Sequence, residues 1–487
     1  MSKVYKALAF SVSSKYLNQL LNLLSIVYVA RMLSPEELGV FAIASALVLI
    51  AAELKSFGAS NYIIREKEIS VNDVQNALGV SVTISWGIGL ALILSSWAIE
   101  SFYQQRDIAS LIHILSISFF LSPHIGVGKA LLSRNFEFKP IFYAESISTL
   151  VKFLAVIVLI LMDYSYFSIA CSTAIGFIVE LLIVIVFRPK RFVVLPKFNK
   201  FSRVFKFGVY DSFSNVFRAS TISLPDLIIG KLGTTSQVAF FSRGLGLLNF
   251  LTMMISSGIR PVVAPFLADK KREGGSLEEP YLKASAMLGV LVIPILAVAG
   301  FAGLPTITFF FGSQWSESAS LVGILCLWSI FRFVHSQSPS LFIAEGYEKL
   351  MFYKELIVFL ITGIFIYLFF PMGLEMVAWG MTLASILDCM IVSVLIHKFF
   401  NIRLINQLKA NILSFFVAIL CVSWCFVLSQ WVDFASTQPG LIVLILAISN
   451  AVVWLLSVYF LKHPIMEPVG KVIKAVRVSL NSKKMSS

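Results

Sequence analysis

The stretch 30-ARMLSPEELGVF-41 returns two hundred residues later as 230-GKLGTTSQVAFF-241. The same offset, without a gap, brings 56-SFG-58 over 256-SSG-258. These stretches occupy equivalent places in the order of apolar segments, so the match predicts an internal duplication of the kind found in transporters. The aligned pairs are Arg31 with Lys231, Ser34 with Thr234, and Phe41 with Phe241.

A second match supports the duplication at a slightly larger offset. The stretch 133-SRNFEFKPIFYAE-145 corresponds to 344-AEGYEKLMFYKE-355 when one residue is deleted. The alignment places Glu145 over Glu355. Both halves of the chain are therefore expected to follow the same order of helices.

The composition is that of an integral membrane protein. Among 487 residues, 58% are hydrophobic and 13% are charged, and the mean hydropathy is +0.88. Soluble proteins have about 25% charged residues. Windows of about twenty apolar residues can cross a hydrocarbon core of about 30 Å. We therefore expect an all-α membrane protein with about fourteen transmembrane helices, of which the first and the seventh are the least apolar. The windows are 7–30, 38–58, 74–99, 108–132, 141–162, 165–187, 204–230, 236–262, 282–310, 319–343, 351–371, 374–397, 408–430 and 441–461.

Basic residues concentrate after alternate windows. The segment 188–206 holds seven Lys or Arg residues and no acidic residue. The loops 162–168, 371–376 and 430–440 hold no Lys or Arg. By the positive-inside rule, both termini face the cytoplasm and the protein lies in the cytoplasmic membrane. The net charge of +13 is thus a topology signal, and we expect no nucleic-acid partner.

Each repeat contains six windows, an even number, so both halves begin on the same side of the membrane. Such halves are related by an axis along the membrane normal. We predict two six-helix bundles that face each other across a central cleft and operate by alternating access. The predicted parts are an N-terminal six-helix bundle (1–190), a basic cytoplasmic linker (191–206), a C-terminal six-helix bundle (207–400), two additional transmembrane helices (401–465) and a basic cytoplasmic tail (466–487).

The first window carries a polar stripe that should not face lipid. Its polar residues are spaced by four, three, four and three positions, which places them on one face of a helix. A cation near the centre of a span costs about 2.5–3.5 kcal/mol on insertion scales. A shift of two hundred residues gives a second stripe in the seventh window. The first stripe is Ser11, Lys15, Asn18, Asn22 and Ser25, and the second includes Asp211, Asn215 and Arg218.

We expect the two stripes to line one cavity. Four cations, two of them from the stripes, would make this cavity suited to an anionic group such as a pyrophosphate. The alternatives are a buried polar network between the halves and, for Lys15, an ammonium that reaches the membrane interface. For the other intramembrane charges, structural pairing is the alternative to ligand contact. We also expect Asp226 to pair with Lys231. The predicted substrate-binding cations are Lys15, Lys152, Arg218 and Arg332; the polar lining is Asn18, Asn22 and Asn215; and the coupling or gating residues are Asp211, Glu145, His335 and Asp388.

Catalytic and metal motifs are absent from the sequence. No Ser/His/Asp set, Walker loop or HExxH motif occurs, and no outer loop is long enough for a catalytic domain. Cys421 and Cys425 share a helix face, but no His or acid stands near them. We expect no enzyme activity, no cofactor, no metal and no disulfide framework. A scaffold without transport would not need charges in the middle of the membrane.

Four stretches, in order, resemble one known family. The stretch 30-ARMLSPEELGVFAIA-44, followed by 57-FG-58, resembles the opening signature of polysaccharide transporters within the multidrug/oligosaccharidyl-lipid/polysaccharide exporter superfamily. The stretch 226-DLIIGKLGTTSQVAFFSRGLG-246 resembles its second-half run. Pro265 and 311-FGSQW-315 stand where the family has Pro and G-x-x-W. The chain is most similar to Wzx-type and colanic-acid-exporter-type flippases, and the resemblance covers residues 5 to about 400.

This resemblance implies a flippase that moves a polyprenyl-pyrophosphate-linked oligosaccharide from the inner to the outer leaflet. Family members use a cationic lumen, and some couple transport to a proton or sodium gradient. The implied partners are therefore the lipid-linked oligosaccharide, H+ or Na+, membrane lipid, and a polysaccharide polymerase with other biosynthesis components. A multidrug or cation antiporter and a lipid II-type flippase are the alternatives in the same superfamily. The turn 234-TTSQ-237 departs from the family pattern, and we expect it to cap the next helix.

Overall fold

Every secondary-structure element in the described part of the chain is a helix, which confirms the all-α prediction. The computed structural model describes residues 2–55, 59–66, 68–189, 195–198, 209–272, 277–434 and 436–466. Within these ranges, the side chains of residues 2–13, 59, 61, 65, 209, 211, 257–272 and 344 lie outside the description.

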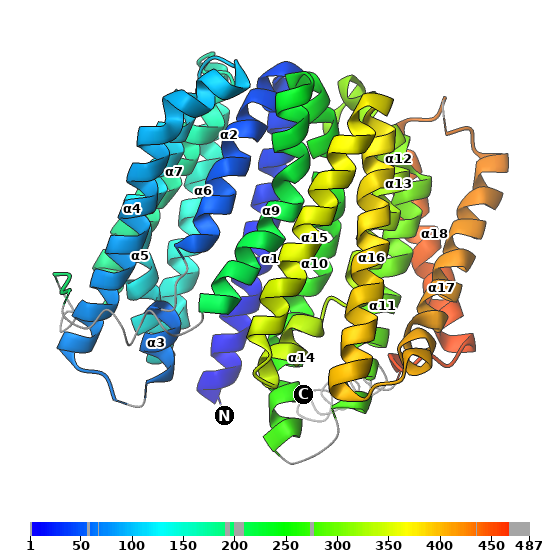
Figure 1. Ribbon diagram of the computed structural model, residues 1–487. Helices are drawn as coiled ribbons and strands as arrows, with labels where there is room; N and C mark the ends of the chain where they lie inside the picture. The colour runs from blue at the N-terminus through cyan, green and yellow to red at the C-terminus, as the bar shows by residue number, and fades with distance from the viewer. Residues whose placement is uncertain are drawn as a thin grey trace, which may run out of the picture. The chain divides into compact units, whose positions relative to one another are not determined.

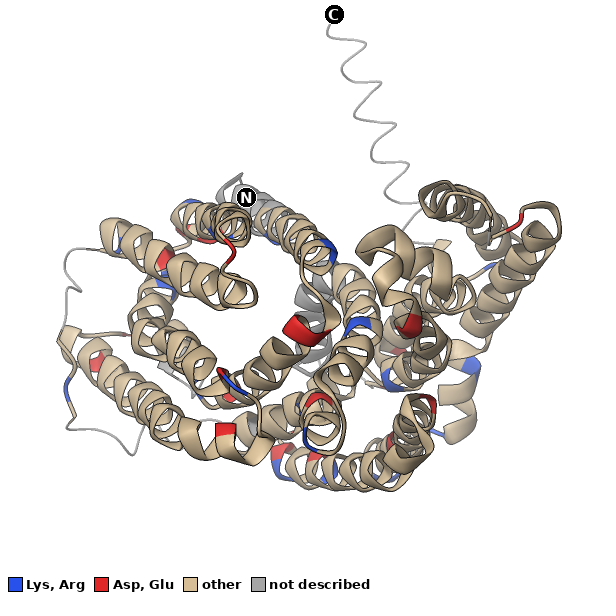
Figure 2. Cartoon of the chain, turned by 90° about the horizontal axis from the view of Figure 1, so that it is seen from above, with Lys and Arg blue, Asp and Glu red and all other residues tan. Residues whose placement is uncertain are grey.

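Twelve helices in the described ranges are long and apolar enough to cross a membrane. Two further long helices, α1 (Ser2–Met32) and α9 (Val209–Leu232), are the two that the sequence marks as least apolar. Together they account for the fourteen predicted spans and make the chain a multi-pass membrane protein. Lys, Arg, Asp and Glu residues are sparse along the helices, as Figure 2 shows.

The backbone groups into two compact units. The first consists of Met1–Arg243, Phe311–Trp315 and Glu348–Val377, and the second consists of Gly244–Phe310, Ser316–Tyr347 and Ala378–Ser487. The first unit takes in helices of both predicted repeats, because α9 packs on α2 and α15 packs on α9. The predicted bundle boundaries around 191–206 stay a prediction.

The first unit is built from long helices packed side by side (Figure 1). Within it α1 packs on α6, α6 on α7, and α5 on both α4 and α7. Besides α1 and α9, its elements are α2 (Pro35–Leu54), α3 (Ala59–Arg65), α4 (Val71–Tyr103), α5 (Ile108–Arg134), α6 (Phe138–Leu161), α7 (Phe167–Phe187), the start of α10 (Thr235–Arg272), η2 (Ser313–Trp315), α15 (Glu348–Phe369) and η3 (Phe370–Met372).

In the second unit, α11 packs against both α13 and α17, and α17 packs against α18. Buried polar groups join α17 to α11: the Asn411 amide donates to Ser285 Oγ at 3.1 Å. The helices of this unit are the remainder of α10, α11 (Glu278–Phe301), α12 (Gly303–Phe311, whose last residue belongs to the first unit), α13 (Ser316–Val334), α14 (Ser338–Ala344), α16 (Leu374–Phe400, whose first four residues belong to the first unit), α17 (Leu404–Trp431) and α18 (Pro439–Phe460).

The span predicted at 319–343 is interrupted. Helix α13 ends at Val334, and α14 begins at Ser338, so His335 lies in the turn between them. Pro339 suits the break, because proline lacks the N–H group that would continue the helical hydrogen bonds and is tolerated in the first turn of a new helix. The predicted span is confirmed as Ser313–Ile343, with this turn inside it.

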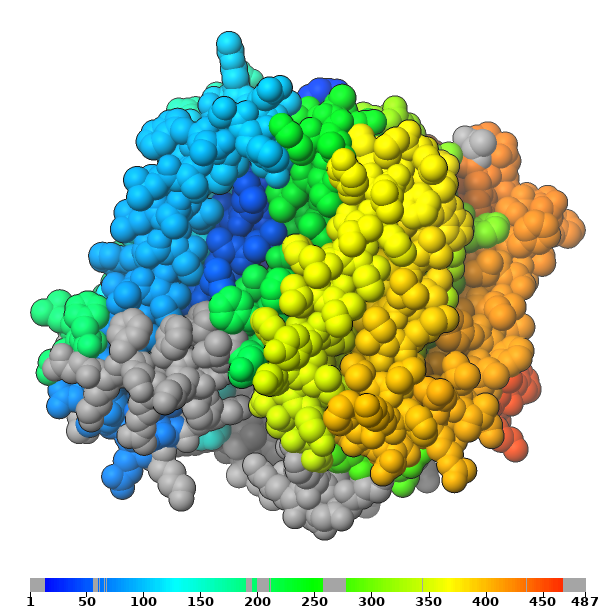
Figure 3. Space-filling view, in the orientation of Figure 1, coloured from blue at the N-terminus to red at the C-terminus, as the bar shows by residue number. Residues whose placement is uncertain are grey.

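Small residues let the helices of the first unit approach closely. The Ser85 hydroxyl of α4 donates to the Phe119 carbonyl of α5 at 2.6 Å. A Cβ atom at Gly128 of α5 would stand only 2.3 Å from Val184 of α7. Such contacts are typical of helices packed in lipid, where the hydrophobic effect does not drive association. In the space-filling view, residues of α1 and α2 are visible at the bottom of a hollow between α4 and α9 (Figure 3).

Helices α2 and α10 begin in the same way, as the duplication predicts. At α2, the Ser34 side chain accepts from the backbone N–H of Glu37, and the Glu37 carboxylate accepts from that of Ser34. At α10, Thr234 and Gln237 form the same reciprocal pair, with distances of 3.2 and 3.0 Å. These capping boxes satisfy backbone donors that the first helical turn leaves free. The capping role predicted for 234-TTSQ-237 is confirmed.

The two capped ends also touch each other. The Ser236 hydroxyl donates to Glu36 Oε1 at 2.6 Å. Gly39 faces Thr235 so closely that a Cβ atom would stand 1.9 Å from the Thr235 carbonyl oxygen. Residues 36 and 236 are equivalent in the repeat, and contact between equivalent residues is expected at a two-fold axis.

Further contacts close this end of the first unit. The Trp315 indole donates to the Ala30 carbonyl at 2.7 Å, and the Lys231 ammonium donates to the Phe102 carbonyl at 2.6 Å. The predicted pairing of Asp226 with Lys231 is wrong: Asp226 interacts electrostatically with Arg243, which stacks on Trp315 at 5.2 Å. Residues five apart on a helix point about 140° away from each other at 3.6 residues per turn, which separates Asp226 from Lys231.

Candidate functional site

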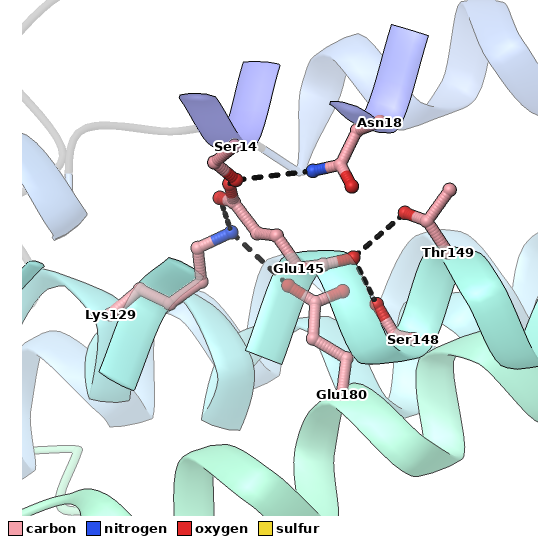
Figure 4. Close-up of polar contacts among 7 residues, drawn as sticks. All are labelled: Ser14, Asn18, Lys129, Glu145, Ser148, Thr149 and Glu180. Atoms are coloured by element: carbon pink, nitrogen blue, oxygen red, sulfur yellow. Dashed lines mark hydrogen bonds and ion pairs between the residues drawn. The ribbon is translucent and has the colours of Figure 1, made fainter. Parts of the chain in front are cut away.

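An ion cluster lies inside the first unit, where α5, α6 and α7 meet (Figure 4). Its centre is Lys129 of α5. The Lys129 ammonium lies 2.5 Å from Glu145 of α6 and 3.1 Å from Glu180 of α7. The ammonium therefore bridges two carboxylates that come from different helices.

Helix α1 is attached to this cluster. The Ser14 hydroxyl of α1 donates to Glu145 Oε2 at 3.0 Å, and the Asn18 amide donates to Ser14 Oγ at 3.2 Å (Figure 4). The Asn18 carbonyl oxygen is buried and has no hydrogen-bond partner within the described residues. One part of the polar α1 stripe thus faces protein, as its sequence pattern predicts.

The local sequence places Glu145 for these contacts. Ser148 and Thr149, one turn further along α6, donate to the backbone carbonyl of Glu145 at 3.0 and 2.8 Å. Such hydroxyls satisfy their own hydrogen bonds inside the helix and leave the carboxylate free for other helices. Gly176 of α7 leaves room for the aliphatic stem of Lys152, whose Cβ would lie 3.3 Å from an added Cβ.

The cluster holds unequal charges and is only partly shielded. The Lys129, Glu145 and Glu180 side chains are 28%, 30% and 16% exposed. Two carboxylates stand against one ammonium, so the triad as ionised carries one negative charge in excess. An intramembrane group of this kind can exchange a proton or a cation, and proton relays of pumps and transporters use such residues.

Lys55, at the end of α2, is the next cation along the cluster. Its ammonium lies 5.1 Å from the Phe119 ring and 5.3 Å from the Phe177 ring. The nearby negative charges are the carboxylates of Glu180 and Glu53, which interact electrostatically with this ammonium.

The other predicted residues of the first unit are scattered around this cluster. Lys15 is exposed on α1, and Asn22 and Lys152 are half-buried. On α9, Arg218 donates to the Asn215 side chain. The side chain of Asp211 lies outside the described residues. The cationic cavity predicted from these residues stays a prediction.

The remaining predicted residues belong to the second unit. Arg332 stacks on the Trp328 ring at 5.1 Å. His335 is buried, and its two ring nitrogens lie 3.0 Å from the Tyr281 hydroxyl and 2.7 Å from the Ser393 hydroxyl. Asp388 lies on α16. The gating roles of His335 and Asp388 stay predictions, since the two hydrogen bonds of the His335 ring also suit a packing role.

The sequence analysis missed Lys129, the residue at the centre of the cluster. Lys129 lies near the end of its window and close to Arg134, so it resembles the basic residues that flank a membrane span. Its spacing could have signalled a role, because four apolar or small residues separate the two cations and leave Lys129 inside the apolar stretch. Within the described residues, no three His, Cys, Asp or Glu side chains are grouped as a metal site requires.

The fold and the ion cluster define a multi-pass membrane protein with charged side chains between its helices. The lipid II flippase MurJ, solved in an inward closed conformation, shares the fold: the likeness covers 93% of this chain and 99% of that one, with a TM-score of 0.73 and 16% identity.

Sequence comparison gives the family. The pattern of the family described as polysaccharide biosynthesis protein matches residues 28–320, and the chain belongs to this family. The lipopolysaccharide biosynthesis protein WzxC of Escherichia coli (strain K12) is 23% identical over 442 residues, which are 87% of this chain and 83% of that protein. The succinoglycan biosynthesis transport protein ExoT of Rhizobium meliloti (strain 1021) is 21% identical over 327 residues, which are 66% of each chain.

Proposed function

We propose that the protein is a flippase that moves a polyprenyl-pyrophosphate-linked oligosaccharide, the repeat unit of a polysaccharide, across the cytoplasmic membrane. The observation that carries this proposal is the family match over residues 28–320, in a chain that shares the fold of the lipid II flippase MurJ. The names of two relatives, which refer to lipopolysaccharide biosynthesis and succinoglycan transport, support a glycan as the cargo.

The cargo explains the cations. A pyrophosphate carries negative charge that must be stabilised away from bulk water, and guanidinium and ammonium groups provide charge-assisted hydrogen bonds for it. Lys15, Lys152, Arg218 and Arg332 are the proposed pyrophosphate-binding cations, and Asn18, Asn22 and Asn215 the proposed lining for the sugar. Exposure of Lys15, and the half-buried state of Lys152 and Arg218, agree with groups that a ligand can reach.

Transport by alternating access is supported by the closed end of the first unit. With both termini in the cytoplasm, as the positive-inside rule predicts, the starts of α2 and α10 face the outer side. The contact of Ser236 with Glu36, and that of Trp315 with Ala30, would have to open to release a cargo outward.

Deletion of the gene in its host tests the proposal. We expect loss of one surface glycan and accumulation of its lipid-linked repeat unit on the cytoplasmic leaflet, measured by mass spectrometry of extracted lipids and by surface labelling. Wild-type protein should restore export, and Arg218→Ala or Lys15→Ala should restore much less at equal membrane content.

Two exposed cations at the ends of helices serve as matched controls. Arg403→Ala and Lys398→Ala remove the same charges at exposed positions next to α17 and on α16. These variants should restore export as the wild type does. A deletion strain with an unchanged set of surface glycans and lipid-linked precursors would contradict the proposed function.

A further inference from the structure

The turn of residues 335–337 between α13 and α14 (the break) leaves a backbone carbonyl without its helical donor. The Ser338 N–H donates to the His335 carbonyl at 2.9 Å, one position further along than the helical pattern requires. The carbonyl of Val334, the last residue of α13, therefore needs another donor inside a membrane span. The Ser285 hydroxyl of α11 supplies one at 3.1 Å.

The duplication does not explain the break. The repeat places His124 over His335, and the helix that holds His124 is α5, which runs without interruption from Ile108 to Arg134. The two equivalent spans therefore differ in continuity. The support of the interrupted span comes in part from α17, a helix outside both predicted repeats.

Helix α17 reaches the end of α13 by a first route of hydrogen bonds. The Asn411 amide of α17 donates to Ser285 Oγ at 3.1 Å, and the Ser285 hydroxyl donates in turn to the Val334 carbonyl. Hydrogen bonds in such a chain polarise and strengthen one another where the dielectric is low. The first route thus runs from α17 through α11 to the last residue of α13.

A second route from α17 ends one residue further on. The Gln407 amide donates to the Ser393 carbonyl of α16 at 3.2 Å, and the Ser393 hydroxyl lies 2.7 Å from the His335 ring. The other ring nitrogen lies 3.0 Å from the Tyr281 hydroxyl of α11. A neutral imidazole has one donor and one acceptor nitrogen, and a hydroxyl can play either part, so both bonds form in either tautomer. The ring is therefore fixed between α11 and α16.

Both routes begin on one face of α17 and lie away from solvent. Gln407 and Asn411 are four residues apart, which places them one above the other on a helix. Gly289 of α11 lets this face approach, because an added Cβ atom would stand 2.7 Å from Asn411 Oδ1. A buried polar group that loses its partner costs more than the bond contributed, so each route resists interruption. The exposed fractions are 5%, 4%, 7% and 8% for Gln407, Asn411, Ser285 and His335.

We propose that α17 clamps the break and thereby sets the position of Arg332. Arg332 lies in the last turn of α13 and stacks on Trp328 of the same helix at 5.1 Å, so its guanidinium follows the end of this helix. Gln407 and Asn411 are positioning residues that act through Arg332. The proposal deepens, and rests on, the proposed function, because Arg332 is one of its pyrophosphate-binding cations. It also gives α17 a role in transport.

Hydrogen exchange of the purified full chain in lipid nanodiscs tests the clamp without a ligand. Asn411→Leu removes the first donor of one route at nearly constant volume. The amides of residues 335–343 should then exchange roughly ten-fold faster, the effect of losing one buried hydrogen bond. Asn450→Leu is the matched control, because the buried Asn450 amide donates to Cys425 Sγ at 3.2 Å and takes no part in either route. That variant should leave these amides unchanged.

A second set of variants tests whether the groups act in series. Ser285→Ala interrupts the first route one step nearer the break and should raise exchange over residues 335–343 as Asn411→Leu does. Because the two residues share one route, the double variant should exchange no faster than the faster single variant. Gln407→Leu interrupts the other route, so its effect should multiply that of Asn411→Leu.

Binding of farnesyl pyrophosphate, a short prenyl pyrophosphate, tests the position of Arg332. Asn411→Leu should weaken binding by roughly five- to ten-fold, part of what one hydrogen bond to a charged group contributes. In an Arg332→Ala background, the same change should have no further effect, since the clamp acts through that guanidinium. A helix that only supports packing would weaken binding equally in both backgrounds.

Three outcomes would overturn the proposal: unchanged exchange over residues 335–343 in both Asn411→Leu and Ser285→Ala, an equal increase in Asn450→Leu, or weakened binding that does not depend on Arg332. Exchange needs no ligand, so the two ideas fail separately. A wild-type protein that shows the clamp but binds no prenyl pyrophosphate would refute the proposed cation site, and the role of Arg332 with it, while the clamp stands. A break that loosens in Asn411→Leu without weaker binding would refute the positioning role and leave the flippase intact.

Discussion

Two glutamates that the repeat makes equivalent, Glu145 and Glu355, lie in different surroundings. Glu145 reaches Lys129 on another helix, and the two side chains are 30% and 28% exposed. Glu355 pairs with Lys354, its neighbour on α15, at 2.9 Å, and these side chains are only 5% and 7% exposed. The supporting helices are alike, since α1 packs on α6 and α9 packs on α15.

The difference shows how one position can acquire two roles after duplication. A lysine on a separate helix joins several helices through contacts that solvent can reach, so the contact can be made and released. The lysine next in sequence to Glu355 lies on the same helix, and burial makes the two charges expensive to separate. We infer that the pair of Lys354 and Glu355 maintains structure, whereas the cluster around Glu145 is suited to change during function.

The largest effect is expected at the buried pair. Glu355→Ala removes the carboxylate that lies 2.9 Å from the buried Lys354 ammonium, which should lower the free energy of unfolding by about 3–5 kcal/mol. Unfolding in mixed detergent micelles measures this change. Glu145→Ala, in a more exposed cluster, should cost clearly less.

A double variant controls for loss of packing at the buried pair. Lys354→Met combined with Glu355→Leu replaces both charges with apolar groups of similar size, which is often close to neutral for a buried ion pair. Its stability should return toward that of the wild type. Equal losses for Glu355→Ala and Glu145→Ala would remove the contrast between the two regions.

Much of the fold can be predicted from the sequence, because a helix that crosses a membrane needs about twenty mostly apolar residues. Apolar length predicts the spans, and the least apolar windows are those of α1 and α9. The repeat predicts that helices α2 and α10 are capped alike, because Ser34 and Thr234 are both good N-cap residues.

The site was harder to predict, since side chains from four helices meet in it. A stripe on one helix indicates which face avoids lipid, but it does not indicate which neighbour that face meets. Periodicity identified Asn18 and the alignment identified Glu145, whereas Lys129 resembles a flanking cation until α5 is placed beside α6 and α7. The pairing of Asp226 failed for the same reason, because its partner Arg243 lies on the next helix.

A smaller effect is expected when the cation of the functional cluster is removed. Lys129→Ala leaves Glu145 and Glu180 as neighbouring, partly shielded carboxylates, which should cost about 1–3 kcal/mol. Glu180→Gln in the same chain removes the repulsion, so the double variant should be more stable than the sum of the single changes predicts, by about 0.5–3 kcal/mol. A double-mutant cycle in mixed micelles measures this coupling. Strictly additive losses would mean that Lys129 does not bridge the two carboxylates.

The smallest effect is expected where the two halves behave alike. Ser34→Ala and Thr234→Ala each remove the side-chain acceptor of a capping box and should each cost about 1 kcal/mol. Glycine at the same positions should cost only a few tenths of a kcal/mol. Because both caps satisfy the same backbone donor three residues on, their losses should agree within about 0.5 kcal/mol. Unequal losses at the caps would show that the halves already differ where their local sequences agree, and the contrast between Glu145 and Glu355 would then need no separate functional cause.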